Sequence, residues 1–445
     1  MHMHARLLKC RVFGAVVIAA VLAVRVMAGP LSPPAGPVGA SYKTLSEVEP
    51  RIAVNETNTP GAGTTAVYKI TAPGSYYLTG NVTAVGSKNA IGIYANNVTL
   101  DLNGFTVEGL AGSTSAVILV AGDSTNPSVD PRGNVTIKNG TVRGGGGAGV
   151  LSQSTVSGVR LSGVTARNNT GTGFGIGDRS QLENCSASDN GSHGFLLGSD
   201  VVVIACIART NGGDEFRAGA GSVFSNCLAD NGGANGAGFN VGAGAAFSNC
   251  TAINSQLDSG FECDGGGAFE NCTARGNGGS GFRGDGDGNV FTGCTSSENG
   301  AHGFSFTNST TIANCNAFSN GQHGALVTSG STITGSTFRG NGIDGIRASN
   351  ACVILNNSCY NNTGAGILVT GSGNTRVEGN TVTNNATGIS VAGGAIVVRN
   401  TASNNPAATG ANDFVSSGNN AIGQIFDVTA GATITTSNSF ANFKY

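Results

Sequence analysis

Residues 223–241, VFSNCLADNGGANGAGFNV, contain one complete unit of the pattern that determines the fold. Apolar Phe224 and Cys227 alternate with polar neighbours, and a period of two residues is typical of a β-strand with one buried face. Asn226 interrupts the alternation with a residue type that tolerates a left-handed backbone, so it predicts a sharp bend between two short strands. A third short strand is expected to begin at Phe239, after a glycine-rich turn.

The pattern recurs along most of the chain at intervals of 21 to 23 residues, which indicates a repeat architecture. The predicted bend residues are Gly163, Asn184, Ala205, Asn226, Asn249, Asn271, Gly293, Asn314, Gly335, Asn357, Gly379 and Asn400. A second bend is predicted at the Asn-Gly pairs 190–191, 211–212, 299–300, 320–321 and 341–342. Two earlier units end at Asn103 and Asn139.

Equivalent residues of successive units are expected to stack in columns, because neighbouring parallel strands lie ~4.8 Å apart. One column holds Cys185, Cys206, Cys227, Cys250, Cys272, Cys294 and Cys315, and another holds Phe174, Phe195, Phe216, Phe239, Phe261, Phe282 and Phe304. A helical period is absent, and so is the hexapeptide beat of a left-handed β-helix. The predicted fold is therefore all-β, a right-handed parallel β-helix of about 14 coils with three short strands per coil.

The remaining segments suggest an exported chain with covered solenoid ends. Residues 1–28 combine a basic start, an apolar run and a small-residue cleavage pattern, as in a secretory signal peptide. A Pro-rich spacer follows at 29–40, an N-terminal cap is expected at 41–89, the β-helix at 90–404 and a C-terminal cap at 405–445. Caps are expected because an open end exposes unpaired strand edges and core. No later segment has the ~20 apolar residues that a membrane span requires.

Composition narrows the classes of partner. Charged residues make up 11% of the chain and the formal net charge is −2, which argues against binding of nucleic acid. Seven of the 11 cysteines share one inward column, where neighbouring Cβ vectors run parallel and the sulfurs are poorly placed for a disulfide. We therefore expect them to act as small buried apolar residues.

The repeats, such as 223–241 and TIANCNAFSNGQHGALV at 311–327, resemble the right-handed parallel β-helix proteins of the pectin-lyase-like superfamily. The resemblance covers about 90 to 400, and the flanks resemble those of exported bacterial β-helix proteins without an assigned function. It implies a fold shared by pectate lyases, polygalacturonases and alginate epimerases, and the fold by itself selects none of these activities. The Gly-His-Gly, acidic-pair and Arg-Ile-Lys segments of polygalacturonases have no match here.

Histidines give one candidate site. His193, His302 and His323 each precede the glycine that opens a third strand, and Asp214 and Asp344 hold the same place. His302, His323 and Asp344 should therefore lie on successive coils, where with Arg283 they are the candidate catalytic residues. The alternative is that this turn position favours small polar residues, since Ser259, Ser280, Ala237 and Ala365 also occupy it.

Carboxylates give a second candidate. Asp264 in FECDGGG aligns with Asp285 in FRGDGDG one coil later, and Asp287 follows. Clustered carboxylates in flexible loops suit Ca²⁺, so these three are the candidate metal ligands and Ca²⁺ the one cofactor considered. Solvated turn residues are the alternative.

The outward face of the third strand offers a third candidate. It carries Leu196, Arg217, Asn240, Glu262, Arg283, Ser305, Leu326, Arg347, Leu368 and Ser390. In polysaccharide-cleaving relatives this face often forms the substrate groove, and its arginines suit an acidic polymer. It has no aromatic residue to serve as a sugar platform.

Three functions remain open at this point. The first is a non-catalytic extracellular or cell-surface scaffold or weak binding surface, monomeric and with an extracellular polysaccharide as partner. The second is a polysaccharide lyase, hydrolase or epimerase with a Ca²⁺-dependent site, helped by the loop 121–133 with Asp123, Asp130 and Arg132. The third is a periplasmic metal-handling β-helix, against which the few His and Met residues weigh.

Overall fold

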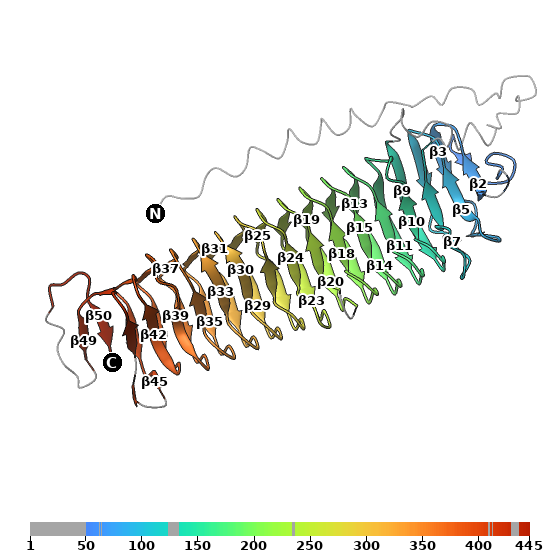
Figure 1. The fold of residues 1–445 in the computed structure, drawn as a ribbon. Helices are drawn as coiled ribbons and strands as arrows, with labels where there is room; N and C mark the ends of the chain where they lie inside the picture. The colour runs from blue at the N-terminus through green and yellow to red at the C-terminus, as the bar shows by residue number, and fades with distance from the viewer. Residues whose placement is uncertain are drawn as a thin grey trace, which may run out of the picture. The chain divides into compact units, whose positions relative to one another are not determined.

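The computed structural model describes residues 50–61, 63, 65–122, 133–233, 236–407, 410–411, 413–428 and 436–445. Within this part of the chain every regular element is a β-strand, and all long-range strand pairs are parallel. From Arg51 to Tyr445 the strands form one compact unit in which coils stack in chain order (Figure 1). The prediction of an all-β parallel β-helix is confirmed. The predicted signal peptide and spacer lie outside the described residues.

Each coil contributes one strand to a sixteen-stranded sheet, called here sheet B. Its strands are β2 (Ala66–Ile70), β5 (Asn89–Ile93), β8 (Ile118–Val120), β10 (Val150–Ser152), β12 (Phe174–Ile176), β15 (Phe195–Leu197), β18 (Phe216–Ala218), β21 (Phe239–Val241), β24 (Phe261–Cys263), β27 (Phe282–Gly284), β30 (Phe304–Asn308), β33 (Ala325–Ser329), β36 (Ile346–Ala348), β39 (Ala365–Val369), β42 (Thr387–Ala392) and β47 (Phe414–Ser417). These are the third strands of the sequence pattern.

The first two strands of each coil belong to a 32-stranded sheet, sheet A, in two rows separated by the first bend. The first row is β3 (Gly74–Tyr77), β6 (Val98–Asp101), β13 (Gln181–Glu183), β16 (Val202–Ile204), β19 (Val223–Ser225), β22 (Ala246–Ser248), β25 (Ala268–Glu270), β28 (Val290–Thr292), β31 (Thr311–Ala313), β34 (Thr332–Thr334), β37 (Val353–Leu355), β40 (Arg376–Glu378), β43 (Ile396–Val398) and β48 (Ala421–Ile422). The second row is β4 (Val82–Thr83), β7 (Thr106–Glu108), β14 (Ser186–Ser188), β17 (Ile207–Arg209), β20 (Leu228–Asp230), β23 (Thr251–Ile253), β26 (Thr273–Arg275), β29 (Thr295–Ser297), β32 (Asn316–Phe318), β35 (Thr337–Arg339), β38 (Ser358–Tyr360), β41 (Thr381–Thr383), β44 (Thr401–Ser403), β49 (Ile425–Asp427) and β50 (Asn442–Lys444). Two long strands, β9 (Val135–Arg143) and β11 (Arg160–Arg167), run through both rows, and β1 (Ile52–Ala53) pairs with β3.

Sixteen coils are present, so the predicted count of about 14 was wrong. The additional coils contain β3 near the N-terminus and β48 near the C-terminus. Tyr76 pairs with Leu100, 24 residues on, and Val397 pairs with Ile422, 25 residues on. Longer turns at both ends therefore move these coils off the interval of 21 to 23 residues, and a fixed period does not detect them.

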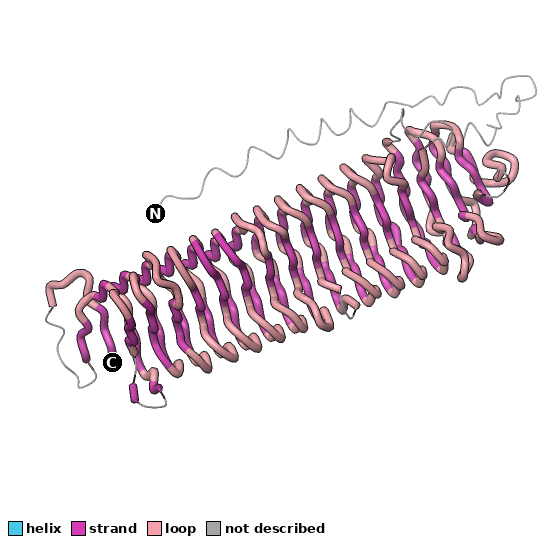
Figure 2. The backbone as a smooth tube through the Cα atoms, in the orientation of Figure 1, coloured by secondary structure: helices cyan, strands magenta, loops and turns pink. Residues whose placement is uncertain are grey.

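The predicted side-chain columns are confirmed in the core (Figure 2 shows the coils in register). Phe239, Phe261 and Phe282 stack with ring centroids 4.8 and 4.9 Å apart. A second phenylalanine column, Phe224, Phe247, Phe269 and Phe291, meets the first edge-on. The seven cysteines of the predicted column are buried and unpaired, as the sequence analysis expected.

Polar ladders run through the turns, and they correct the predicted bends. The Asn of each Asn-Gly pair was expected to turn the chain, but the left-handed residue lies one position earlier, for example at Ser319 (φ 55°). The asparagine itself is buried, and the Oδ1 atom of Asn341 accepts hydrogen bonds from both the backbone and side-chain amides of Asn320, at 3.2 and 3.0 Å. The same link is repeated from coil to coil in what we call the turn ladder. Its asparagines are Asn169, Asn190, Asn211, Asn277, Asn299, Asn320, Asn341, Asn362, Asn385 and Asn405.

At the first bend two predicted positions were also wrong. The left-handed residues are Asn356 and Arg399, whereas Asn357 and Asn400 are buried. These two join a second series of amides, the bend ladder, which contains Asn357, Asn380, Asn400 and Asn442. A buried amide satisfies backbone groups that the bend leaves without partners, so asparagine is used here for its side chain as much as for its backbone.

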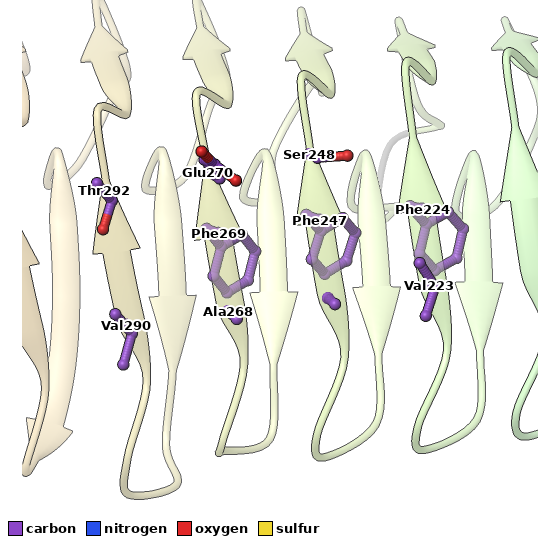
Figure 3. A pocket seen from close by; sticks show the side chains of 10 residues that line it. Val223, Phe224, Phe247, Ser248, Ala268, Phe269, Glu270, Val290 and Thr292 are labelled. Atoms are coloured by element: carbon purple, nitrogen blue, oxygen red, sulfur yellow. The ribbon is translucent and has the colours of Figure 1, made fainter.

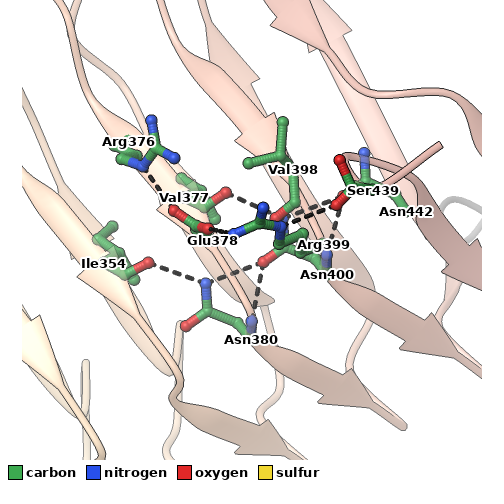
Figure 4. Close-up of polar contacts among 10 residues, drawn as sticks. All are labelled: Ile354, Arg376, Val377, Glu378, Asn380, Val398, Arg399, Asn400, Ser439 and Asn442. Atoms are coloured by element: carbon green, nitrogen blue, oxygen red, sulfur yellow. Dashed lines mark hydrogen bonds and ion pairs between the residues drawn. The ribbon is translucent and has the colours of Figure 1, made fainter.

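The C-terminal residues close the last coil. The bend ladder passes from Asn400 to Asn442, and β50 pairs with β44 and β49. Glu378 accepts from Arg376 at 2.6 Å and from Arg399 at 2.7 Å, and Arg399 also donates to the carbonyl of Ser439 (Figure 4). These contacts fasten residues 439–445 onto the coil that precedes them.

Candidate functional site

The outward face of sheet B carries a regular arginine row. The Cα partners of successive strands place Arg217, Arg283 and Arg347 at one position of the coil, with two coils between each pair. Strands in a sheet lie about 4.8 Å apart, so the row has a spacing of about 14 Å along the solenoid. The sequence analysis predicted that these arginines share the outward face, but it did not note that they recur at every third coil. The spacing becomes visible in the sequence once the coils are aligned.

The three arginines differ in their ionic partners. Arg217 lies 3.8 Å from Asp214 of its own coil, and Arg283 lies 3.5 Å from Glu262 of the preceding coil. Arg347 is partly exposed and has no ion pair within the described part of the chain. The face therefore presents one unpaired guanidinium and two that are paired loosely.

Glu262 shares its surroundings with a second carboxyl group. Asp258, in the turn before β24, adjoins it, and the Oδ1 atom of Asp258 accepts the amide of Ser259 at 2.7 Å. Burial and the neighbouring Asp258 raise the pKa of Glu262 to about 7, although Arg283 opposes the shift. The sequence analysis placed Glu262 on the outward face of the third strand and missed Asp258. Asp258 stands four positions before Glu262, in a turn that is one residue longer than most of its equivalents. That longer turn was the available signal for a second carboxyl group near Glu262.

The predicted histidine column is present along the turn that precedes sheet B. The rings of His302 and His323 stack 5.2 Å apart and within 5° of parallel. The Nδ1 atom of His302 accepts the amide of His323 at 3.3 Å, and that of His323 accepts the amide of Asp344 at 3.3 Å. Asp344 ends the column by accepting the amide of Ala365 at 2.8 Å. His193, Asp214 and Ala237 repeat this arrangement nearer the N-terminus.

This geometry fixes what the histidines present to a ligand. A neutral imidazole whose Nδ1 atom accepts a hydrogen bond carries its proton on Nε2, so it is a donor there and not a base. Burial, and then the neighbouring His323 and Arg347, lower the pKa of His302 to about 4, which keeps it neutral at physiological pH. The arrangement gives His302 and His323 a structural role, and the catalytic role of His302, His323, Asp344 and Arg283 stays a prediction.

The acidic candidates lie at the opposite end of the sheet B strands. Asp264 follows β24, while Asp285 and Asp287 follow β27, and all three are exposed. Five residues of extended chain separate the position of Ser280, in the histidine turn, from Asp285, which is roughly 16 Å. The sequence candidates therefore form two separate groups. Among the described residues no three His, Cys, Asp or Glu side chains gather as a metal site requires, and Ca²⁺ binding here stays a prediction. Asp123, Asp130 and Arg132 of the predicted loop lie outside the described residues.

A shallow hollow lies on a different face, over the first row of sheet A (Figure 3). Ala246 and Ala268 leave room between the larger Val223 and Val290, and Ser248 and Glu270 line its polar side. The sequence analysis did not anticipate it, because it results from small residues on adjacent coils. In the described part of the chain, no helix has the length and apolarity to cross a membrane.

These features define the class of protein as a parallel β-solenoid with a regular arginine row on the outward face of sheet B. The model of the right-handed β-helix family matches residues 92–268, 217–343 and 259–407, so the chain belongs to this family. No curated protein matches the sequence.

Several solved structures are similar to this chain at low sequence identity and low TM-score. The mannuronan C-5 epimerase AlgE6 A-module of Azotobacter vinelandii is 18% identical over 84% of this chain and 91% of its own, with a TM-score of 0.33. Pectate lyase Pel9A is 17% identical over 69% and 71%, with a TM-score of 0.30. The tailspike gp49 of Acinetobacter baumannii bacteriophage Fri1, a capsular polysaccharide depolymerase, is 12% identical over 74% and 59%, with a TM-score of 0.29. Likeness at this level carries no argument about activity.

Proposed function

We propose that this chain is an exported β-helix protein whose sheet B face binds an acidic polysaccharide lengthwise, as a scaffold or binding surface and not as a catalyst. Export is supported by the signal-peptide pattern of residues 1–28. The observation that carries the proposal is the arginine row at Arg217, Arg283 and Arg347, one residue every third coil on a straight parallel sheet. Guanidinium groups suit carboxylate and sulfate, which they bind with two parallel hydrogen bonds.

The turn beside this face supports a binding role. His193 and His302 are half-buried, and the Nδ1 atom of each accepts a backbone amide of the next coil, so the neutral ring has its N–H donor at Nε2, whereas His323 is buried. A linear ligand that contacts several coils at once gains from multivalency, so individually weak contacts suffice.

The second candidate is a polysaccharide lyase, hydrolase or epimerase that works on the same face. Glu262 favours it, because a half-buried carboxyl group with a pKa raised to about 7 is suited to donate a proton at neutral pH. Uronate lyase absorbance and product analysis on pectate and alginate, with and without Ca²⁺, separate the two. Turnover lost in a Glu262→Gln variant would favour the enzyme over the scaffold.

The chain offers a matched control for the binding test. Arg209, Arg275 and Arg339 lie in the same three coils as the arginine row, with the same spacing, but on the second row of sheet A. Two triple variants therefore remove the same charge: Arg217→Gln with Arg283→Gln and Arg347→Gln, or Arg209→Gln with Arg275→Gln and Arg339→Gln.

Binding to pectate, alginate and hyaluronan is measured by titration calorimetry at two salt concentrations. We expect the sheet B triple variant to lose about 10² to 10³ in affinity, at about 1 kcal/mol or more per lost charged contact, and the control triple to change little. Equal losses in both variants would mean nonspecific charge attraction. An absence of binding by the unaltered protein to every acidic polymer would refute the proposal.

A further inference from the structure

The middle arginine of the row differs from its two neighbours, because a carboxyl group on the same face faces it from the preceding coil. Glu262 and Arg283 are direct Cα partners on β24 and β27, and both side chains point outward. Their charged atoms lie 3.5 Å apart, with Glu262 less exposed than Arg283 (22% and 51%). An anion that approaches Arg283 therefore meets the carboxyl group of Glu262 as well.

We infer that Arg283 and Glu262 form a proton-coupled subsite, which binds a carboxylate or sulfate group of the polysaccharide while Glu262 takes up one proton. This rests on the proposed function and adds a property to it. In the ionised state Glu262 competes with the ligand for Arg283. In the protonated state the guanidinium is free for the ligand, and the neutral carboxyl group offers an O–H donor instead of a repelling charge.

The groups around Glu262 favour the protonated state once an anion binds. Asp258 adjoins it from the turn before β24, so a second carboxyl group lies beside the Glu262–Arg283 ion pair. On the preceding coil its Cα partner is the uncharged Asn240, and Arg217 lies one coil beyond that. At the far end of β24, Asp264 adds a more distant negative charge. With both carboxyl groups ionised this cluster is net negative, and a bound anion makes it more so.

Burial and Asp258 place the pKa of Glu262 at about 7, so its protonation changes within a range that is easy to reach experimentally. His302 does not titrate in that range, because its pKa is lowered to about 4. Glu215 also has a strongly raised pKa, but it is fully buried and faces Asn211 inside the turn. Glu262 thus combines a direct ion pair with Arg283 and a pKa of about 7, while burial also raises the pKa of Asp214 beside Arg217.

The test measures pectate binding by calorimetry at pH 6 and pH 8, at one ionic strength, for the full chain. Pectate carboxylates stay ionised across this range. We expect the unaltered protein to bind about tenfold more weakly at pH 8, which is the limit over this range for one proton coupled to a group whose pKa is about 7. Glu262→Gln should bind at pH 8 as tightly as the unaltered protein does at pH 6, and should lose the pH dependence. Arg283→Gln should bind weakly at both values.

Calorimetry at pH 7 in two buffers of different ionisation enthalpy counts the protons directly. We expect net proton uptake on binding by the unaltered protein and none by Glu262→Gln. Glu270→Gln, an exposed glutamate on sheet A, is the matched control and should retain both the uptake and the pH dependence. Binding with no pH dependence and no uptake would overturn this inference and leave the proposed function standing. No binding at either pH would overturn both.

Discussion

The coils from Phe174 to Cys315 and those from Ser336 to Asn442 form the same solenoid with different interiors. In the middle coils, stacked rings fill the core and cysteines follow the first bend. In the C-terminal coils, the same columns hold Ile346, Ile367 and Ile389, and the position after the bend holds hydrogen-bonded asparagines. The same backbone position can thus hold either an apolar thiol or a polar amide, provided that the buried amide forms its hydrogen bonds.

The comparison teaches that the coil geometry is set by repetition and not by one kind of contact. A column is stable when each member meets its own kind one coil away, whether ring on ring or amide on amide. It also predicts where the two halves should respond differently to substitution.

The largest effect is expected in the ring column of the middle coils. Phe261 stacks on Phe239 and Phe282 and meets Phe247 and Phe269 edge-on, and it is fully buried. Phe261→Ala should destabilise the protein by about 3–5 kcal/mol through lost burial and the cavity left behind. Urea unfolding at constant pH measures it, and Ile367→Val, at about 0.5–1.5 kcal/mol, is the milder C-terminal control. A loss under 1 kcal/mol would mean that the column is not rigidly packed.

A smaller but distinct effect is expected in the bend ladder of the C-terminal coils. The Oδ1 atom of Asn380 accepts both the backbone and side-chain amides of Asn357, at 2.9 and 3.1 Å. Asn380→Ala leaves the buried backbone amide of Asn357 without a partner and removes one of the two hydrogen bonds of its side-chain amide, which keeps the carbonyl of Ile333, so we expect a loss of about 2–4 kcal/mol. Asn380→Asp is the informative companion, since it keeps the acceptor but removes the donor. Equal unfolding midpoints for Asn380→Ala and the unaltered protein would break the ladder argument.

The third prediction concerns the place where the turn ladder is interrupted. Gly232 stands where the next asparagine is expected, and Glu215 instead accepts hydrogen bonds from the backbone and side chain of Asn211. Burial raises the pKa of Glu215 to about 8 in the folded protein. The contribution of protonated Glu215 to the free energy of unfolding is therefore fully present below the pKa of about 4.3 that the group has in the unfolded chain. This contribution is lost as the pH rises through 8, by up to about 1.4 kcal/mol per pH unit.

Glu215→Gln should remove this slope and make the protein more stable than the unaltered chain at pH 8.5. Thermal unfolding between pH 5 and pH 8.5 measures both curves. Parallel curves for the two proteins would show that Glu215 does not titrate in the folded state. The C-terminal end of the ladder, where Asp413 accepts from Asn405, serves as the comparison through Asp413→Asn.

The smallest effect is expected in the cysteine column. Cys272 occupies the coil position that Asn380 occupies later, but replacing its thiol with a methyl group leaves no backbone donor unpaired. Cys272→Ala should cost about 1 kcal/mol, as a small loss of buried volume. A cost as large as that of Asn380→Ala would show that the thiols contribute hydrogen bonds that the column cannot spare.

The candidate site was predicted unevenly from the sequence. The outward face of sheet B followed directly from strand alternation, so Arg217, Glu262, Arg283 and Arg347 were correctly assigned to one surface. Asp258 was missed because it lies in a turn, where side chains do not alternate between two faces as they do in a strand. The position of its side chain depends on the lengths of the neighbouring turns. His302, His323 and Asp344 were correctly aligned, but the sequence did not reveal that their acceptor atoms are occupied by backbone amides.

The sequence by itself determined the strand period, the register of the columns and which face each strand side chain takes, because a two-residue alternation and a 21- to 23-residue interval depend only on local geometry. Only the tertiary structure decided the number of coils, the inward position of the turn asparagines and the partners of Arg283 and Glu215. Those depend on contacts between residues a full coil or more apart, where one inserted residue in a turn changes which side chains meet.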